Sequence, residues 1–387
     1  MPLDTSVSEG VTILNNTIAP QLDAGQPVDV FGISQSSVIA SLEMEQLDPS
    51  GMPSGLPAQF VLVDNLMNPN GGVFERFAGL TLPSLGLDFY GATPANDFPT
   101  TIYTLEYDGF ADFCQYPANF LCDLNAVIGM ETVHGLALDL TPTQLQSAIL
   151  LPGSEALGAD SLSNYYMIPT TDLPLLDPLR AIPVVGNPLA DLLQPDLTYL
   201  VNLGYGDPLY GWSTSAANVA TPFGLFPSLT DFEMMPGLLA SGTEQGIENF
   251  IGDFSGTGPN AVTLPSLSSL TSLLDSSSGT ASVTSALTAL STATSNPALA
   301  LTDFANALSS TASAAYGTLL PTADIANAFL TSIPAYDASL FLDNLSDPIN
   351  AIGLPIAADM ALGTMLGGLE LEVIGNTIGS IATILIP

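Results

Sequence analysis

Apolar and polar residues follow one another along the first 50 residues in a pattern that predicts a helix, a strand and a second helix. Between residues 7 and 22 the apolar side chains Val11, Leu14, Ile18 and Leu22 recur every three or four positions, the spacing of one face of an amphipathic helix. Pro20 is expected to end this helix. The run PVDVFG at 27–32 is typical of a short strand, and the helical stretch VIASLEMEQL follows at 38–47. We therefore expect a strand, a tight turn and a helix in close succession.

The alternation of strands and helices continues to about residue 130. Residues 59–63 and 100–107 predict two further strands, residues 73–80 and 118–130 predict helices, and NPNGG at 68–72 predicts a turn. Strands that alternate with helices indicate an α/β fold with a mostly parallel sheet. The Pro- and Gly-rich stretches 81–100 and 150–245 predict irregular insertions of the kind that form lids and substrate walls.

Composition changes near residue 249, and Ser, Thr, Ala and Leu dominate from about 255 to 315. This predicts an α/β domain at 1–254 and a low-complexity C-terminal region at 255–387. The most apolar part of that region, 351–387, is interrupted by Asp359, Glu370 and Glu372, so we expect no clean transmembrane helix there. The opening MPLDTSVSEG lacks the basic segment and the apolar run of a signal peptide.

The charge balance excludes one class of partner. The chain has 38 acidic residues and only two basic ones, Arg76 and Arg180, which gives a formal net charge of −36. Because phosphate binding requires Lys and Arg, we expect no nucleic-acid partner. One histidine is too few for a His-rich metal site, and we expect neither a metal nor an organic cofactor. Cys114 and Cys122 are compatible with one disulfide bond or with two free thiols.

A candidate nucleophile lies in the predicted turn after the first strand. The pentad GISQS at 32–36 matches the G-x-S-x-G pattern of the nucleophile elbow, except that Ser36 replaces the second glycine. The elbow holds the nucleophile in a strained turn that admits only small neighbours, and serine is small. An ordinary strand-to-helix turn with a capping serine would contain the same residue types. The position between a predicted strand and a predicted helix favours Ser34 as the nucleophile.

The remaining members of a serine-hydrolase site follow from this assignment. His134 is the only imidazole in the chain, so it is the general base if Ser34 is the nucleophile. In α/β-hydrolases the acid lies between these two in the chain, after a strand. Asp108 follows the strand at 100–107 and is preferred; Asp112 is the alternative, and Asp64 is a third candidate. The backbone N–H of Gln35 is expected to supply one oxyanion-hole donor.

Several long segments resemble the mycobacterial PE-PPE domain. They are GISQSSVIASLEMEQL, NPNGG, YDGFADFCQYPANFLCDLNAVIGM, VHG, YYMIPTTDLPLL, PLRAIPVVGNPLADLLQPDL and LVNLGYGDPLYGW, which together cover about residues 3–225. The resemblance implies a cutinase-like serine α/β-hydrolase with a Ser-Asp-His triad, esterase activity on acyl esters, and a secreted or cell-envelope location. Some relatives resemble acyltransferases that build trehalose glycolipids. Ser34 and His134 match the positions of the family's nucleophile and base, whereas YDGFAD contains two candidate acids.

The sequence departs from the family pattern in three ways. It shows no N-terminal PE or PPE helical module, and Cys114 stands where proline is expected. It also lacks the early strands and the glycine-rich segment that would hold the second oxyanion donor, which predicts an uncovered sheet edge.

Three hypotheses for function remain open. The first is a serine esterase that acts on an acyl ester or glycolipid, with possible contacts between the C-terminal region and envelope lipid. The second is an acyltransferase to a trehalose-type sugar. The third is a non-catalytic envelope or surface protein, or an inactive fragment.

Overall fold

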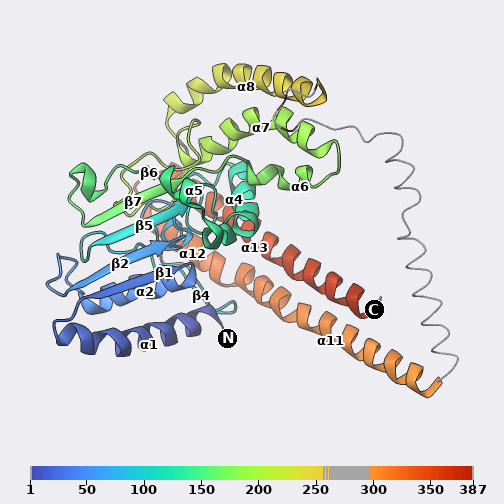
Figure 1. The fold of residues 1–387 in the computed structure, drawn as a ribbon, viewed down its shortest axis with the longest axis horizontal. Coiled ribbons are helices and arrows are strands. Elements are labelled where there is room, and N and C mark those ends of the chain that lie inside the picture. Colours follow the sequence, from blue (N-terminus) through green and yellow to red (C-terminus); the bar gives the residue numbers. More distant parts are fainter. Residues whose placement is uncertain (1, 256–257, 259, 261–296, 386–387) are drawn as a thin grey trace.

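The computed structural model describes residues 2–255, 258, 260 and 297–385 of the chain (Figure 1). Its centre is a five-stranded sheet with the strand order β1-β2-β5-β7-β6. The strands are β1 (Val28–Ile33), β2 (Ala58–Val63), β5 (Thr100–Leu105), β7 (Ser163–Ile168) and β6 (Ile149–Leu150). The first four pair in parallel and β6 is antiparallel to β7. The prediction of an α/β fold with a mostly parallel sheet is thus confirmed.

Helices surround this sheet, and a small antiparallel pair, β3 (Thr81–Leu82) and β4 (Leu87–Asp88), lies beside it. The α-helices are α1 (Leu3–Asp23), α2 (Gln35–Leu47), α3 (Val73–Arg76), α4 (Phe120–Thr132), α5 (Pro142–Gln146), α6 (Asp177–Arg180), α7 (Gly186–Asn202), α8 (Leu229–Ser255), α11 (Pro297–Leu330), α12 (Ser332–Asp343) and α13 (Pro348–Leu385). Short 3-10 helices are η1 (His134–Asp139), η2 (Glu155–Leu157), η3 (Pro174–Leu176) and η4 (Leu203–Tyr205).

One face of the sheet is buried beneath α1 and α2. Along β1 the side chains alternate, so that Val28 and Val30 point into a core that also contains Ile18 of α1 and Met44 of α2. The opposite face is more open, and Phe31 is 65% exposed there. Helix α1 extends to Asp23 with a proline inside it, so the expectation that the helix ends at that proline is wrong. Its packing on α2 outweighs the local cost of the proline.

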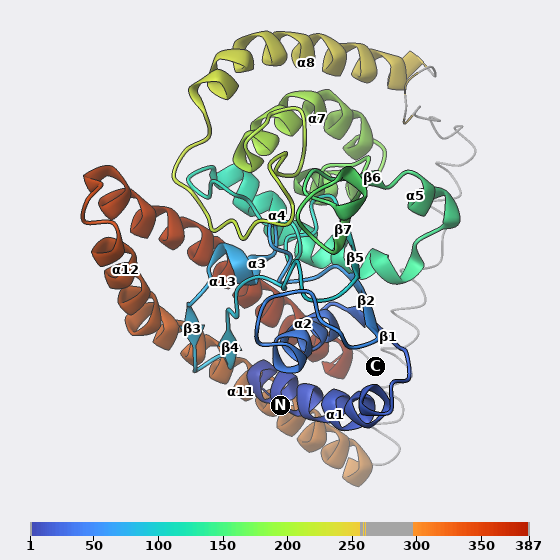
Figure 2. The same ribbon diagram turned by 90° about the vertical axis from the view of Figure 1, so that its left-hand side faces the viewer.

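The stretch 150–245 contains more regular structure than the sequence predicted. It holds strand β7 and helices α7 and α8, which pack against each other above the β7–β6 edge of the sheet (Figure 2). The prolines of α7 favoured an irregular structure: Pro188 lies in its first turn and Pro195 in its interior. Packing on α8 and α4 stabilises the helix nonetheless, because tertiary contacts routinely override intrinsic propensity.

The C-terminal helices pack against the α/β core. Ile325 of α11, Ile333 of α12 and Leu362 of α13 belong to the same buried cluster as Phe77 and Ala126. Helices α11 and α13 run side by side and extend beyond the body of the molecule (Figure 1). The division of the chain after residue 254 stays a prediction, and residues 256–257, 259 and 261–296 of the predicted C-terminal region lie outside the described residues.

One helix among the described residues has the length and composition of a membrane-spanning helix. It is the segment Pro348–Ser380 of α13, with a mean hydropathy of 1.4. Helix α13 contacts α4, α11 and α12, but only 28% of the most apolar part of this segment is buried. By length and composition, the acidic residues of 351–387 therefore do not exclude a candidate membrane span, contrary to the expectation from the sequence.

Both basic side chains of the chain are bound within the fold, Arg76 in the core and Arg180 in half-buried ion pairs. Arg76 is fully buried and donates hydrogen bonds to the Phe113 carbonyl and to Asn70 Oδ1. Arg180 forms ion pairs with Asp172 at 3.3 Å and Asp191 at 2.9 Å. The fold also closes a disulfide bond between Cys114 and Cys122, which settles the two possibilities that the sequence left open.

Candidate active site

The carboxyl ends of three parallel strands bring the candidate residues together. Ser34 follows β1, Asp64 follows β2, and Asp108 lies three residues after β5. The backbone N–H of Ser34 donates to the Val63 carbonyl at 3.0 Å, and that of Asp64 donates to the Tyr103 carbonyl at 2.9 Å. Pairing between neighbouring strands therefore fixes the backbone positions of Ser34 and Asp64 at this edge of the sheet.

The turn at Ser34 has the geometry of a nucleophile elbow. Ser34 adopts φ 54° and ψ −126°, a backbone conformation that is strained for a residue with a side chain. At Gly32 a Cβ atom would lie 2.7 Å from the Ser36 carbonyl oxygen, so only glycine fits. The Ser36 hydroxyl accepts a hydrogen bond from the Ile33 N–H and donates one to the Ile33 carbonyl, both at 2.7 Å. Ser36, which replaces the second glycine of the pattern, thus stabilises the turn through these two hydrogen bonds.

Three side chains form a continuous hydrogen-bonded chain. His134 Nε2 lies 2.7 Å from Ser34 Oγ, and His134 Nδ1 lies 2.8 Å from Asp108 Oδ2. Asp108 is fully buried, whereas Ser34 and His134 are half-buried and can be reached from solvent. Asp108 Oδ1 also accepts a hydrogen bond from the Phe110 N–H at 3.0 Å, and the Phe110 ring packs edge-on against the imidazole at 4.8 Å.

His134 is positioned by the end of α4, where Val133 caps the helix and η1 begins. The hydrogen bond to the buried Asp108 carboxylate selects the tautomer with the proton on Nδ1, which leaves Nε2 free to accept the Ser34 proton. The three residues that the sequence preferred for nucleophile, base and acid are therefore in direct contact.

Asp112, the alternative acid, lies elsewhere in the core. Its carboxylate accepts a hydrogen bond from the Tyr107 N–H at 3.3 Å, and the pKa of Asp112 is raised well above its usual range by burial, against a smaller opposing effect of Arg76. The only carboxylate that is hydrogen-bonded to His134 among the described residues is that of Asp108.

Gln35 is the first residue of α2, so its backbone N–H is one of the first-turn donors that have no acceptor within the helix. The Gln35 side chain is bound to α1, since its Nε2 atom donates a hydrogen bond to Ser6 Oγ at 2.7 Å. Within residues 2–255 a helix, and not a strand, precedes β1.

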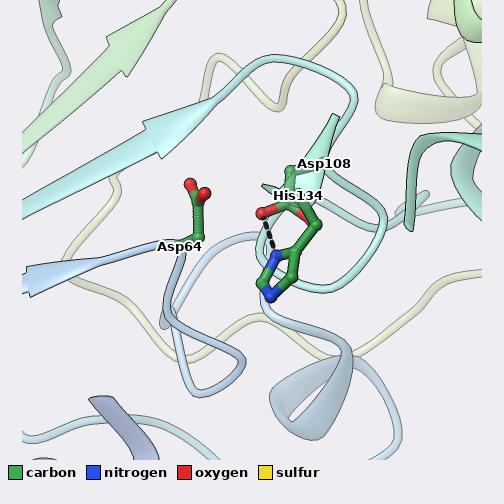
Figure 3. A group of neighbouring side chains, drawn as sticks. All are labelled: Asp64, Asp108 and His134. Atoms are coloured by element: carbon green, nitrogen blue, oxygen red, sulfur yellow. Dashed lines mark hydrogen bonds and ion pairs between the residues drawn. The ribbon is translucent and has the colours of Figure 1, made fainter. Parts of the chain in front are cut away.

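Asp64, the third candidate acid, is also part of this cluster. Figure 3 shows its carboxyl group beside the hydrogen-bonded pair of Asp108 and His134. One carboxyl oxygen of each aspartate and one ring nitrogen of His134 lie within 4.8 Å of one another. Carboxylate and imidazole groups this close together are the ligand types of cation sites. Both ring nitrogens of His134 are, however, already engaged by hydrogen bonds to Asp108 and Ser34.

A cavity of about 440 Å³ is lined by Val133, the residue before His134, but by none of Ser34, Asp108 and His134. Leu105, Val133, Leu136 and Ile168 contribute apolar surface to it, and Val133 precedes His134 directly. On η1, Leu136 and Leu138 are 47% and 77% exposed. Polar side chains, including those of Asp172 and Asp177, line the same cavity.

Sequence reasoning missed two features of the site. The contact of Phe110 with the imidazole depends on the turn after β5, although Phe110 lies next to the candidate acids in the chain. The closeness of Asp64 to Asp108 depends on the pairing of β2 with β5, which the sequence pattern does not specify.

Comparisons with known proteins agree with this architecture. A family model described as the PE-PPE domain matches residues 1–206. The chain is 46% identical over 403 residues to the uncharacterized PPE family protein PPE28 of Mycobacterium tuberculosis (strain ATCC 25618 / H37Rv), covering 100% of this chain and 59% of that protein. It is 48% identical over 227 residues to Esterase PE16 of the same strain, covering 58% of this chain and 41% of that protein.

A more distant relative carries a different activity in its name. Diacyltrehalose acyltransferase Chp2 of the same strain is 25% identical over 217 residues, covering 51% of this chain and 56% of that protein. The chain thus spans roughly half the length of the curated relatives it matches. No solved structure matches the chain.

Proposed function

Since the chain belongs to the PE-PPE domain family, we propose that it is a serine esterase that hydrolyses acyl esters of carboxylic acids. The observation that carries this proposal is the pair of hydrogen bonds that joins Ser34 to His134 at 2.7 Å and His134 to Asp108 at 2.8 Å. A hydroxyl in contact with an imidazole, itself held by a buried carboxylate, is the arrangement that activates serine for attack on a carbonyl carbon.

The reaction proceeds through an acyl-enzyme. Ser34 Oγ attacks the acyl carbonyl carbon while His134 Nε2 takes the hydroxyl proton. Collapse of the tetrahedral intermediate breaks the ester C–O bond, and the alcohol leaves with the proton from His134. Water then attacks the acyl-enzyme with His134 as base, which releases the carboxylic acid. Asp108 stabilises the imidazolium, and the Gln35 N–H donates to the developing oxyanion.

The surroundings of the site favour a neutral acyl ester over an anionic one. The cavity next to Val133 has the volume of a small-molecule pocket and presents Leu105, Val133 and Ile168 together with Asp172 and Asp177. Leu136, which lines the cavity, and Leu138, two residues further along η1, add exposed apolar surface. Since Arg76 is buried and Arg180 is ion-paired with Asp172 and Asp191, neither is available near Ser34 to pair with an anionic substrate.

A fluorophosphonate probe tests this proposal directly, because it reacts covalently only with an activated serine. Wild-type protein should be labelled, and Ser34→Ala and His134→Ala should each reduce labelling by about 10⁴-fold or more. Ser50→Ala, which changes an exposed serine in the turn after α2, serves as the matched control and should label like the wild type. If folded wild-type protein is not labelled, the non-catalytic hypothesis replaces the esterase.

Acyl transfer is the second candidate, and the similarity to a diacyltrehalose acyltransferase is the observation that favours it. The same acyl-enzyme would be attacked by a sugar hydroxyl instead of water. Product analysis with an acyl ester and trehalose distinguishes the two: free carboxylic acid alone supports hydrolysis, whereas acylated trehalose supports transfer.

We also propose a location in the cell envelope or outside the cell. The disulfide bond between Cys114 and Cys122 supports it, because disulfides persist in oxidising compartments. Fractionation of the producing cells, with immunodetection of the chain in cytosol, envelope and medium, tests the location.

A further inference from the structure

A second carboxyl group beside the triad has no role in the mechanism described above. Asp64 is fully buried at the end of β2 and has a backbone φ of 46°, which few residues other than glycine adopt. Its Oδ1 atom accepts a hydrogen bond from the Leu105 N–H at 3.2 Å. Its Oδ2 atom is buried and has no hydrogen-bond partner. A buried polar atom without a partner is costly and calls for an explanation.

The position of Asp64 supplies that explanation. Oxygen atoms of Asp64 and Asp108 lie within 4.8 Å of each other and of the imidazole of His134 (Figure 3). Two buried carboxylates at this separation cannot both be ionised without a large cost. Asp108 is bonded to His134 and to the Phe110 N–H, which stabilises its anionic form. The proton is therefore expected on Asp64.

The charged groups around Asp64 also favour its protonated form. The groups that face it are Asp108 after β5, His134 after α4, and the Leu105 N–H of β5. Neither arginine is bonded to Asp64. Arg76 is bonded to Asn70 and Phe113, and Arg180 is bonded to Asp172 and Asp191. Burial, and then the charge of Asp108, raise the pKa of Asp64 well above its usual range.

We propose that Asp64 is a positioning residue: its protonated carboxyl group donates a hydrogen bond to Asp108 and holds that carboxylate in place on His134. The active site would then contain a carboxylic acid and a carboxylate that share one proton and one negative charge. This inference rests on the proposed esterase function for its kinetic consequences, but not for the protonation of Asp64.

The pair predicts a distinctive dependence of activity on pH. As pH rises, Asp64 loses its proton, the donor to Asp108 disappears, and a second negative charge develops beside the first. The kcat of the wild type on an acyl ester should therefore fall at alkaline pH. Asp64→Asn keeps a neutral donor that does not titrate, so it should retain activity near neutral pH and lose this alkaline fall.

Asp64→Ala removes the donor altogether and should lower kcat by about tenfold at the pH where wild-type Asp64 is protonated, the effect of one hydrogen bond to a charged group. This difference from the wild type should shrink at alkaline pH, where wild-type Asp64 has lost the same donor. Asp112→Asn, a change in a buried carboxyl that is not bonded to His134, is the matched control and should keep the alkaline fall. A purely structural role for Asp64 predicts a different result: Asp64→Asn would change thermal stability but leave the shape of the pH profile as in the wild type. That result overturns the proposal.

Infrared spectroscopy tests the protonation without requiring activity. The difference spectrum between wild type and Asp64→Asn at neutral pH should contain the carbonyl band of a protonated carboxylic acid. A difference spectrum that shows only the bands of an ionised carboxylate overturns the inference, whether or not the protein proves to be an esterase. Absence of fluorophosphonate labelling in the wild type, by contrast, refutes the proposed function alone.

Discussion

Substitution of Gly32 by alanine tests whether the elbow determines the reactivity of Ser34. An added Cβ would lie 2.7 Å from the Ser36 carbonyl oxygen and 2.9 Å from Ser37 Cα, and both are backbone atoms. The turn would have to open by about 0.7 Å to reach the 3.4 Å of an ordinary contact. It cannot open freely, because the Ser36 hydroxyl bonds both backbone groups of Ile33.

Two magnitudes follow from this displacement. A shift of this size in a reacting group costs roughly 10- to 100-fold in rate, since a misplacement of about 1 Å can cost about 100-fold. Overpacking of a tight site also lowers the free energy of unfolding by about 1–3 kcal/mol. Gly32→Ala should therefore slow fluorophosphonate labelling of Ser34 strongly while the melting temperature falls by only a few degrees.

The assay compares second-order labelling rates and melting curves of the wild type, Gly32→Ala and Gly55→Ala. Gly55 is exposed, and a Cβ atom added there meets nothing within 4 Å, so this variant should match the wild type in both measurements. If Gly32→Ala reacts at the wild-type rate and melts at the wild-type temperature, the elbow geometry does not control the nucleophile and the reasoning fails.

Two further predictions concern stability. Replacing both Cys114 and Cys122 by alanine should lower the free energy of unfolding by about 2.5 kcal/mol, because the bond no longer restricts this short loop in the unfolded chain. Chemical denaturation measures this change, and an unchanged midpoint would contradict a stabilising role for the bond. Burial raises the pKa of Glu106 from 4.5 to about 7, against weaker hydrogen bonds from the Thr170 and Gly211 backbone. A raised pKa contributes stability that is complete below pH 4.5 and is lost as pH rises through about 7, so the free energy of unfolding should fall by up to about 3 kcal/mol over this range, and the melting temperature should fall with it. Glu106→Gln should flatten this dependence, and an equally steep curve in that variant would assign it to other groups.

Local sequence signals were sufficient for the parts of the site that form within one stretch of chain. The β1 strand, the turn at Ser34 and the start of α2 lie within 20 residues, and alternation, a required glycine and helical spacing indicate each of them. His134 could be chosen because the chain contains no other imidazole.

Features that depend on distant contacts could not be predicted in this way. Strand β7 was missed because its sequence, SNYYMI, lies between Pro- and Gly-rich stretches and owes its conformation to pairing with β5. Asp64 could be named only as a third candidate, since its contact with Asp108 arises from the register between β2 and β5. The packing of Ile325 and Leu362 against the α/β core likewise joins residues that are more than 190 positions from Ala126 in the chain.

The confinement of the two arginines, together with the absence of lysine, gives the molecule an unusual chemical surface. Arg76 is fully buried, and the Arg180 side chain is ion-paired on a short helix. The native protein thus presents few accessible sites to a protease that cleaves after basic residues, and cutting after Arg76 requires the core to open. Acetylation and ubiquitin attachment at lysine side chains have no acceptor anywhere in these 387 residues. With both cysteines in a disulfide bond, covalent regulation of side chains in this protein would fall mainly on its hydroxyl and carboxyl groups.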